Sequence, residues 1–495
     1  MSAAVRRLSG RVTWMIVLLS LLVGVGIGFV AGPPRQQLAA ASTGDPDLAA
    51  RARAGLGDGS GLRSVVVAEV TRSSVRWAGL GSAAGGARPG LPPDDQTGYE
   101  LGSITKTFTA ALFADAIKRR EVRADDTLAK HLPELRDAPA GRVTLASLAQ
   151  HRSGLPPLGA TAQAATAWVA LNDNLYATST TEVLLADAAA ASITKDQPPT
   201  YSNLGFALLG TALVRASGAT DYQALVTQRV TGPLGMDRTA TAGSDADVPA
   251  YAVRGHTSNG LIAPRWTGTG YLPAGTSTFT TAGDLAIWAQ AQLTGQAPGS
   301  AALEPTADMD AGSRIGWAWF STPAADGRVI TWHNGITAGF HTMLALDRDA
   351  GRAVLVMGDT ATDLDVFAVA LLNRTPVDPP APSTALIVVT LGVVALALLT
   401  GVLALREAIR CTAVLPAVNA LLGAVFGLLL MWTSGPWMFV GGWLWGLALG
   451  LTLAATVILG LRGRELTFLP EQRRWLAWVN LVVGVGLVAF AVTLW

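Results

Sequence analysis

The sequence predicts an α/β domain of two lobes, followed by an α-helical transmembrane bundle. Of its 495 residues, 50% are hydrophobic and only 14% are charged, which is too apolar for a purely soluble protein of this size. The apolar residues concentrate in one segment near the N-terminus and in further segments after residue 383. Between these regions, strand-like runs come first and last, and helical patterns lie in the middle. Each element of this architecture can be justified in order.

The first apolar segment covers residues 12–34, carries no charge and follows Arg6, Arg7 and Arg11. It is long enough to cross a hydrocarbon core of ~30 Å, and the arginines predict a cytoplasmic N-terminus. A cleaved signal peptide is the alternative, because small residues at Ala39 to Ser42 could follow a cleavage site. An apolar run longer than a signal core of ~7–15 residues favours a membrane anchor. On either interpretation the next segment is exported.

Residues 43–375 are predicted to form the exported domain. Arg63 to Val70 and Val75 to Leu80 flank a turn and predict a β-hairpin. Four further strand-like runs follow near the end of the domain: Ile315 to Phe320, Val329 to His333, Thr342 to Leu346 and Ala353 to Met357. Five helical patterns lie between: Leu145 to Ala149, Ala162 to Leu171, Thr181 to Ala190, Gly205 to Ala216 and Tyr222 to Val230. Such a chain forms one α/β unit when its first and last strands share a sheet and the helical lobe covers one edge.

A proline-rich linker at residues 376–383 leads to residues 384–495, which are predicted to form four transmembrane helices. The four apolar segments are Thr384 to Leu405, Thr412 to Met431, Trp437 to Leu461 and Leu476 to Trp495. Arginines occupy two of the connections, at Arg406 and Arg410 and at Arg462, Arg464, Arg473 and Arg474, whereas Thr433 to Pro436 carries no charge. With a cytoplasmic N-terminus, both arginine loops lie inside. The sequence therefore predicts a multi-pass protein of the cell membrane with an extracytoplasmic catalytic domain.

The four C-terminal segments contain no charged residue, and intramembrane charges usually mark ion or proton pathways. This composition favours anchoring in the lipid bilayer, or binding of a membrane protein partner, over transport. The net charge of +1 gives no indication of a nucleic-acid partner. The single cysteine, Cys411, excludes an internal disulfide.

The candidate nucleophile is Ser103, in a stretch that begins at Tyr99 and places Lys106 one helical turn further on. A serine hydroxyl needs a base within hydrogen-bond reach, and a lysine whose ammonium form is destabilised can supply it. The N–H of Ser103, at the start of the helix, could also stabilise an oxyanion. Alone this motif is weak evidence, because Ser192 to Lys195 repeats it. That copy runs into prolines and is interpreted as a loop.

Tyr201 and Asn203 are the second pair of candidates, directly before the helical pattern that begins at Gly205. A tyrosine beside a charged Lys106 would have its phenolate form favoured and could relay a proton between Ser103 and a leaving group. Asn203 could hold both the lysine and a substrate amide. The alternative is a turn in which Asn203 caps the helix.

The third candidate stretch is His333 to Ile336, at the end of a predicted strand. Gly335 would allow close approach of a substrate backbone. The N–H of Ile336 could serve as a second oxyanion donor beside that of Ser103. The alternative is a strand that ends in an Asn334-Gly335 turn.

Together, Gly102-Ser-x-x-Lys-Thr-Phe-Thr109, Tyr201-x-Asn203 and His333-x-Gly335 resemble the serine β-lactamase and penicillin-binding protein superfamily. In particular, the chain resembles the class C β-lactamases, D-alanyl-D-alanine carboxypeptidases and related esterases. Three shorter stretches support this: Gln150 to Pro156, Gly232 to Asp237 and Pro273 to Leu285. The resemblance covers about residues 50 to 370.

The resemblance implies a β-lactamase-like fold with an antiparallel sheet, flanking helices and a helical lobe. It assigns the nucleophile to Ser103, the general base to Lys106 with Tyr201, and the oxyanion hole to the N–H groups of Ser103 and Ile336. Asn203, His333 and Gly335 would contact the substrate. No metal or other cofactor is implied. Acylation of Ser103 would be followed by hydrolysis.

His333 departs from the lysine that β-lactamases carry at this position. Histidine is largely neutral at pH 7, so it lacks the permanent charge that would attract a substrate carboxylate. Capture of β-lactams is therefore less expected. The predicted location outside the cytoplasm makes cell-wall peptides that end in D-Ala, or related amides and esters, the first expected substrates. β-Lactamase or small-ester esterase activity is the first alternative. A receptor that binds a ligand or β-lactam without turnover and signals through the membrane helices is the second.

Overall fold

The computed structural model describes residues 8–59, 61–166, 174–194, 198–257, 260–310, 312–380, 382–463, 466–470 and 474–492. The chain divides into two compact units. The sheet unit spans Gln37–Ser258 and Ile262–Pro380, and the helix unit contains the N-terminal segment to Gln36, the C-terminal segment from Ala381 and residues 259–261. Each unit is described by itself.

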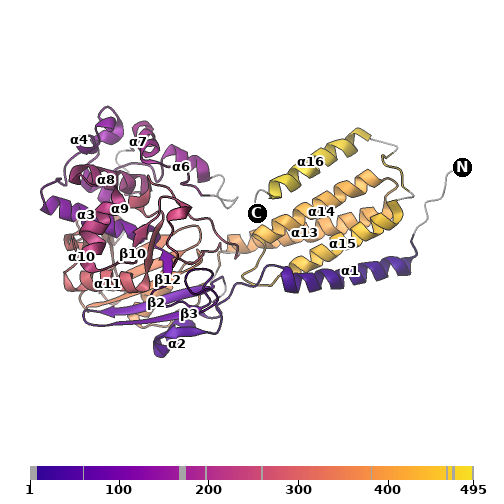
Figure 1. Cartoon of the computed structure of the whole chain (residues 1–495), viewed down its shortest axis with the longest axis horizontal. Helices are drawn as coiled ribbons and strands as arrows, with labels where there is room; N and C mark the ends of the chain where they lie inside the picture. Colours follow the sequence, from indigo (N-terminus) through magenta and orange to yellow (C-terminus); the bar gives the residue numbers. More distant parts are fainter. Residues whose placement is uncertain are drawn as a thin grey trace. The chain divides into compact units, whose positions relative to one another are not determined.

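A nine-stranded antiparallel sheet, in the order β1-β3-β2-β12-β11-β10-β9-β8-β7, organises the sheet unit (Figure 1). Its strands are β1 Ser42–Gly44, β2 Ser64–Thr71, β3 Val75–Gly81, β7 Ala307–Asp310, β8 Ser313–Ile315, β9 Phe320–Pro323, β10 Val329–Ile336, β11 His341–Asp347 and β12 Arg352–Gly358. Because β2 pairs with β12, the first and last parts of the domain share one sheet, as the element order predicts. The predicted hairpin is confirmed by β2 and β3.

Both faces of the sheet are buried, and the alternation along β2 shows how. Val65 and Val67 join the core under α2 (Pro46–Leu56) and α12 (Asp365–Asn373), whereas Val66 and Ala68 join the larger core on the opposite face. That larger core includes α3 (Thr105–Lys118) and α11 (Ala282–Thr294). A strand buried on both faces reads as a continuous apolar run, which explains the Val-rich sequence of β2.

A helical lobe lies between the two halves of the sheet in sequence. Its helices are α4 Leu128–His131, α5 Leu145–Ala149, α6 Ala160–Ala165, α7 Thr181–Ala190, α8 Asn203–Ser217, α9 Tyr222–Val226 and α10 Gly232–Leu234. The patterns of α5 and α7 are confirmed to the residue. Residues 167–171 of the predicted Ala162 to Leu171 helix lie outside the described residues. A small sheet of β4 (Gly98–Glu100), β6 (Thr278–Thr281) and β5 (Ala240–Thr241) completes the unit.

Several predicted boundaries were wrong. The predicted strand from Ile315 to Phe320 is instead the turn between β8, which ends at Ile315, and β9, which begins at Phe320, and the Gly316 N–H to Trp319 carbonyl bond closes this turn. The predicted Tyr222 to Val230 helix ends at Val226 and continues as a π-helical turn, Thr227–Thr231. Finally, β10 continues through Asn334 and Gly335 to Ile336, because β11 pairs with it over that whole length.

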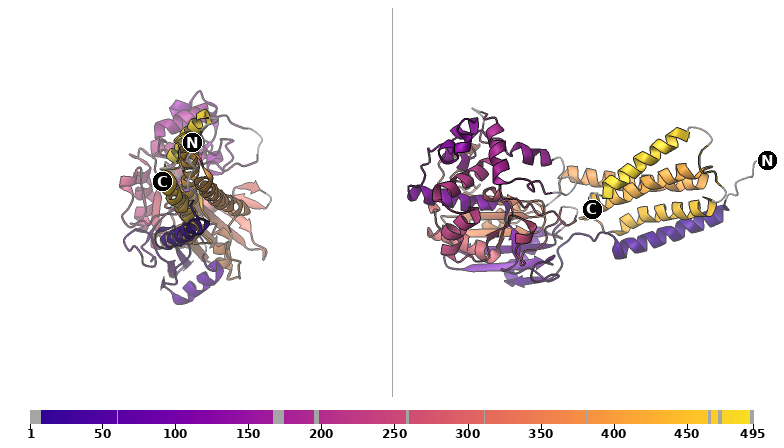
Figure 2. Two further views of the ribbon diagram at one scale, coloured as in Figure 1. Left: turned by 90° about the vertical axis from the view of Figure 1, so that its right-hand side faces the viewer. Right: turned by 45° about the horizontal axis from the view of Figure 1, so that its top comes forward.

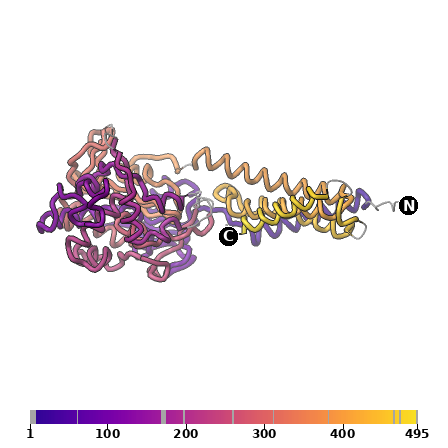
Figure 3. Tube along the Cα trace, turned by 90° about the horizontal axis from the view of Figure 1, so that it is seen from above, coloured from indigo at the N-terminus to yellow at the C-terminus, as the bar shows by residue number. Residues whose placement is uncertain are grey.

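The helix unit contains five helices that are long and apolar enough to cross a membrane, among the residues described. They are α1 Gly10–Ala31, α13 Thr384–Arg410, α14 Val414–Ser434, α15 Trp443–Arg462 and α16 Arg474–Val492. Figure 3 shows their traces running alongside one another. The predicted segments match in number and order, although α13 extends five residues beyond Leu405 and α15 begins six residues after Trp437.

The helices α1 and α15 pack through glycines at every fourth position. Gly28 lies against Gly442 and Gly446, and a Cβ built on Gly28 would lie 2.5 Å from the Gly442 carbonyl oxygen. Gly24 and Gly32 meet the same face of α15, at Gly446 and Gly450 and at Gly442 respectively. The later residues of α1 thus face the earlier residues of α15, so the two helices are antiparallel (Figure 2). Close backbone contact between small residues is how membrane helices associate without a hydrophobic driving force.

Candidate active site

Ser103 lies in a single 3₁₀ turn, Gly102–Ile104, that leads directly into α3. The sequence predicts Ser103 at the start of this helix, and the α-helix itself begins slightly later, at Thr105. Lys106, in the first turn of α3, is fully buried, and its Nζ lies 2.8 Å from Ser103 Oγ. The two residues therefore meet, as their spacing predicts.

Two carbonyl oxygens also contact the amine of Lys106. Its Nζ donates to Asn203 Oδ1 at 2.7 Å and to the Ala274 carbonyl at 2.6 Å. Burial holds the pKa of Lys106 well below its usual value. A neutral amine has two N–H groups and one lone pair, and both carbonyls can only accept. With both N–H groups so used, the lone pair is left for the Ser103 hydroxyl, the arrangement a general base requires.

Tyr201 lies beside this pair, directly before α8. Lys106 Nζ is 4.8 Å from the centroid of its ring. Burial raises the pKa of Tyr201 above its usual value, and a hydrogen bond with Ser103 opposes this shift. The expectation that the phenolate form is favoured was therefore wrong, because desolvation of Lys106 removes the positive charge on which it depended. The phenol keeps its proton and can donate it.

Asn203 is the first residue of α8 and not its cap. Ser202 caps the helix, because its Oγ accepts from the Gly205 N–H at 2.9 Å. The Asn203 side chain is thereby released from capping and contacts Lys106 instead. The helix begins two residues before the predicted Gly205.

Two glycines bring β10 against the turn that holds Ser103. A Cβ on Gly335 would lie 3.1 Å from Ser103 N and closer still to the Leu101 carbonyl. A Cβ on Gly102, which has a φ of +60°, would lie 2.9 Å from Ile336 N. The N–H groups of Ser103 and Ile336 therefore lie on backbone segments in direct contact, and a larger side chain at either glycine would separate them.

The strand β10 also offers an edge. It pairs with β9 only from Val329 to Trp332, whereas its pairing with β11 continues to Ile336. From His333 on, the β9 side of the strand has no paired neighbour among the described residues. An extended ligand could align there.

His333 is fully buried, and its Nδ1 lies 2.6 Å from the Asn334 carbonyl. Burial lowers the pKa of His333 to about 3. The imidazole is therefore neutral throughout the neutral range, as its residue type predicted. Its ring centroid is 6.4 Å from that of Tyr201 and 5.4 Å from that of Phe320.

His151 had no predicted role, although it lies in the stretch from Gln150 to Pro156 that supports the resemblance. Its Nδ1 accepts from the Ser202 N–H at 3.0 Å, and its ring centroid lies 4.3 Å from that of Tyr201. Burial lowers the pKa of His151 well below its usual value, so the neutral ring can accept this bond. His151 thus orients the segment that carries Tyr201 and Asn203. The Ala274 carbonyl was missed for a different reason, because a backbone acceptor leaves no residue signature.

The second Ser-x-x-Lys copy lies only in part within the described residues. The helix α7 ends at Ala190, so Ser192 lies in irregular structure, and Lys195 is outside the described residues. This confirms the loop interpretation for residues 192–194.

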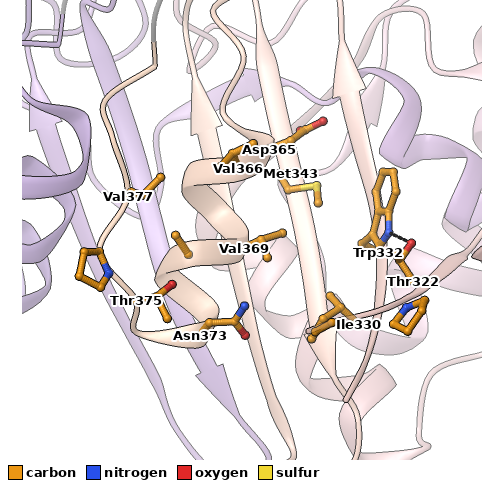
Figure 4. Close-up of a pocket in the computed structure, with 14 residues that line it drawn as sticks. Thr322, Ile330, Trp332, Met343, Asp365, Val366, Val369, Asn373, Thr375 and Val377 are labelled. Carbon is orange, nitrogen blue, oxygen red and sulfur yellow. Dashed lines mark hydrogen bonds between the residues drawn. The ribbon is translucent and has the colours of Figure 1, made fainter. Parts of the chain in front are cut away.

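A cavity of about 470 Å³ lies on the other face of β10, beside α12 (Figure 4). Ile330, Trp332 and Val369 line it, and Trp332 Nε1 donates to Thr322 Oγ1 at 3.0 Å. Because side chains alternate along a strand, His333 and Gly335 point away from this cavity. It is separate from the candidate site.

One group of potential metal ligands occurs among the described residues, and it does not include the candidate residues. His341, Asp363 and Asp365 bring their ligand atoms within 4.8 Å of one another. Asp365 already accepts from Asn334 Nδ2 at 2.6 Å and lies 2.7 Å from His341 Nε2. These hydrogen bonds support the ends of β10 and β11.

Comparison with known proteins places this geometry in a family. The Beta-lactamase family profile matches residues 37–389. The D-alanyl-D-alanine-carboxypeptidase/endopeptidase AmpH of Escherichia coli K12 is 32% identical over 170 residues, which is 32% of this chain and 42% of that protein. A Beta-lactamase of the same strain is 32% identical over 161 residues, covering 32% and 39%. The matched region thus spans about two fifths of these curated relatives.

Solved structures show the same fold. A class C β-lactamase from Rhodobacter sphaeroides superimposes with a TM-score of 0.57 at 20% identity, covering 66% of this chain and 99% of that chain. The D-alanine carboxypeptidase AmpC from Burkholderia cenocepacia gives a TM-score of 0.54 at 20% identity, covering 66% and 98%. The antiparallel sheet, the helical lobe and the match over most of the sequence lead to one conclusion: the chain belongs to the Beta-lactamase family.

Proposed function

We propose that this protein is a serine hydrolase that forms an acyl-enzyme on Ser103. The observation that carries the proposal is the environment of Lys106, whose Nζ lies 2.8 Å from Ser103 Oγ while Asn203 and the Ala274 carbonyl occupy its N–H groups. Burial keeps this amine in the neutral form that a general base needs.

In the acylation step, Ser103 Oγ attacks the carbonyl carbon of an amide or ester, and the hydroxyl proton passes to Lys106. The N–H groups of Ser103 and Ile336 donate to the oxyanion. Tyr201 gives its proton to the leaving amine or alcohol as the C–N or C–O bond breaks, and it recovers a proton from Lys106. In the second step, Lys106 takes a proton from the water that attacks the acyl carbon, and this proton passes to Ser103 Oγ as the bond between Oγ and the acyl carbon breaks and the acid leaves.

For the substrate, we propose a peptide of the cell wall that ends in D-Ala, or a related amide or ester. The relatives named as D-Ala carboxypeptidases support this class. The open β10 edge beside Gly335 suits an extended peptide backbone. The neutral His333 supplies no charge to hold the carboxylate of either a D-Ala peptide or a β-lactam. β-Lactams and small esters are the alternatives that the experiment separates.

For the location, we propose a multi-pass membrane protein with the sheet unit outside the cytoplasm. The antiparallel contact of α1 with α15 supports this topology, because helices of opposite direction are required if α1 runs outward and α15 inward. The same contact favours a retained anchor over a cleaved signal peptide, since cleavage would remove the partner of Gly442 and Gly446.

Labelling of the detergent-solubilised protein and its Ser103→Ala variant tests the reaction. A fluorescent fluorophosphonate and a fluorescent penicillin both report on the serine. We expect the fluorophosphonate to label wild type alone. A lasting penicillin adduct would indicate a penicillin-binding enzyme, its rapid loss a β-lactamase, and its absence an esterase or peptidase. Labelling that persists in Ser103→Ala would refute Ser103 as the nucleophile, and a protein that the probes label but that turns over no peptide or ester substrate would favour the receptor alternative.

A further inference from the structure

The buried carboxyl of Glu100 has no part in the reaction described above. Glu100 is the last residue of β4, lies three residues before Ser103 and is 1% exposed. Its Oε1 accepts from the Ser277 N–H and its Oε2 from the Thr337 hydroxyl, each at 3.2 Å. Desolvation of a carboxyl is unfavourable, so the burial of Glu100 near the nucleophile needs a physical explanation.

The contact with Ser277 supports the turn that delivers the Ala274 carbonyl to Lys106. Ser277 has a φ of +49°, which is uncommon for a residue with a side chain. Three hydrogen bonds hold it there: its N–H donates to Glu100, its Oγ donates to the Trp266 carbonyl at 2.6 Å, and its carbonyl accepts from the Ala242 N–H at 2.9 Å. Without the carboxyl acceptor, Ser277 would lose one of these three bonds, the one that its N–H makes.

The contact with Thr337 supports the opposite side of the site. Thr337 directly follows Ile336, whose N–H is the proposed second oxyanion donor, and it is 3% exposed. Its hydroxyl donates to Glu100, and its N–H donates to the Phe340 carbonyl at 3.0 Å. The carboxyl therefore fixes the point at which β10 ends.

We propose that Glu100 is a positioning residue that holds the general base and the oxyanion donor of the Ser103 site in register, through Ser277 and Thr337. The inference rests on the proposed serine hydrolase function. Glu100 touches neither substrate nor reacting atoms, and it acts through the backbone on both sides of the nucleophile.

The protonation state of Glu100 matters for this role. A carboxylate can accept from both partners, whereas a carboxylic acid must donate from one oxygen, and the Ser277 N–H cannot accept. Burial raises the pKa of Glu100 to about 7, while the bonds from Ser277 and Thr337 and the charge of Arg265 lower it and Asp245 raises it. Arg254, a further cation, faces Arg265. Acylation should therefore slow as the pH falls through about 7, when the Thr337 hydroxyl must turn to accept.

The test measures the rate at which the fluorophosphonate labels Ser103 in the full-length, detergent-solubilised protein, above and below pH 7. Glu100→Gln mimics the protonated form, because its amide accepts from Ser277 and donates to Thr337. We expect it to react about 10- to 100-fold more slowly above pH 7, as expected for small misplacements of catalytic groups, and to lack the Glu100 inflection. Thr337→Val should also slow labelling but keep an inflection.

Asp284→Asn is the matched control. Asp284 is a buried carboxyl on α11 with a raised pKa, and it likewise accepts from one backbone N–H, that of Arg238, and one threonine hydroxyl, that of Thr239, each at 2.8 Å. We expect its rate and pH profile to match wild type.

The outcomes separate this inference from the proposed function. Glu100→Gln with the rate and pH profile of wild type would overturn the positioning role while leaving the hydrolase intact. If Glu100→Gln does not fold, wild-type kinetics in Thr337→Val would overturn it instead. A wild-type protein that no probe labels at Ser103 would overturn the proposed function and this inference with it.

Discussion

The two units differ in the contacts that this structure brings to notice. The sheet unit buries ionisable groups beside its candidate site and gives them partners: Lys106 contacts three oxygens, and Asp359 accepts from Ser64 N at 2.8 Å and from Ser64 Oγ at 2.8 Å. In the helix unit, α1 and α15 instead meet at glycines, where backbone contacts backbone. Burial in a domain core removes polar groups from water and shifts their pKa values, which suits them to chemistry. In lipid, helices have no hydrophobic driving force to associate, and they gain stability from packing.

Substitutions should therefore have different effects in the two units. In the sheet unit, altering a polar side chain should change chemistry more than stability. In the helix unit, altering a small residue should change stability more than chemistry. Four substitutions test these expectations.

Lys106→Met should have the largest effect. It keeps the length of the side chain and removes the base, so we expect the acylation rate of Ser103 to fall by roughly 10²- to 10⁴-fold. The measurement is the second-order rate of fluorophosphonate labelling. Lys118→Met, at the exposed end of the same helix, is the control and should label like wild type. A Lys106→Met protein that labels at the wild-type rate would show that another group takes the proton.

Gly335→Ala should have the next largest effect. The new Cβ would clash with Leu101 O and lie 3.1 Å from Ser103 N, which would push β10 away from the nucleophile. Displacing one oxyanion donor typically costs roughly 10²- to 10³-fold in rate. Ile336→Ala keeps the N–H and removes a side chain that is 51% exposed, so its labelling rate should change little. Equal loss in both variants would mean that the side chain of Ile336 is what matters.

The pH dependence of stability should show a smaller effect at Glu100. Its pKa is about 7 in the folded protein against an ordinary 4.5, so the folded state binds more protons between these values. The free energy of unfolding should therefore decrease as the pH rises from below 4.5 through about 7, by roughly 3 kcal/mol. Melting temperatures of wild type and Glu100→Gln, compared across this range, check it. A constant difference between the two proteins would contradict the shift.

Gly28→Leu should have the smallest effect on free energy and none on the chemistry. The side chain would collide with Gly442 and Gly446 and separate α1 from α15, at a cost of about 1–3 kcal/mol, typical of overpacking. Gly26→Leu lies on the same helix with no atom within 4 Å of its Cβ position, so it is the matched control. The measurement is the melting temperature in detergent. Equal melting of the two variants would argue against the α1–α15 contact.

Much of this organisation was predictable because it depends on local sequence patterns. The hairpin of β2 and β3 follows from apolar runs around a turn, and the helices long and apolar enough to cross a membrane follow from the length of their apolar runs. Contacts between segments that are distant in the sequence were harder to predict. Asn334-Gly335 looks like a turn in isolation, but pairing with β11 keeps it extended.

The sequence by itself determined the order of the elements, the segments long and apolar enough to cross a membrane, and the identity of the candidate residues from Ser103 to Ile336. These features depend on residue type and spacing, which can be read directly from the sequence. The tertiary structure decided the surroundings of those residues. Burial lowers the pKa of Lys106 and raises that of Tyr201, Glu100 reaches Ser277 and Thr337 only across the fold, and the Ala274 carbonyl is a backbone group without a residue signature. Desolvation and backbone contacts arise between segments far apart in sequence, so only the packed chain contains them.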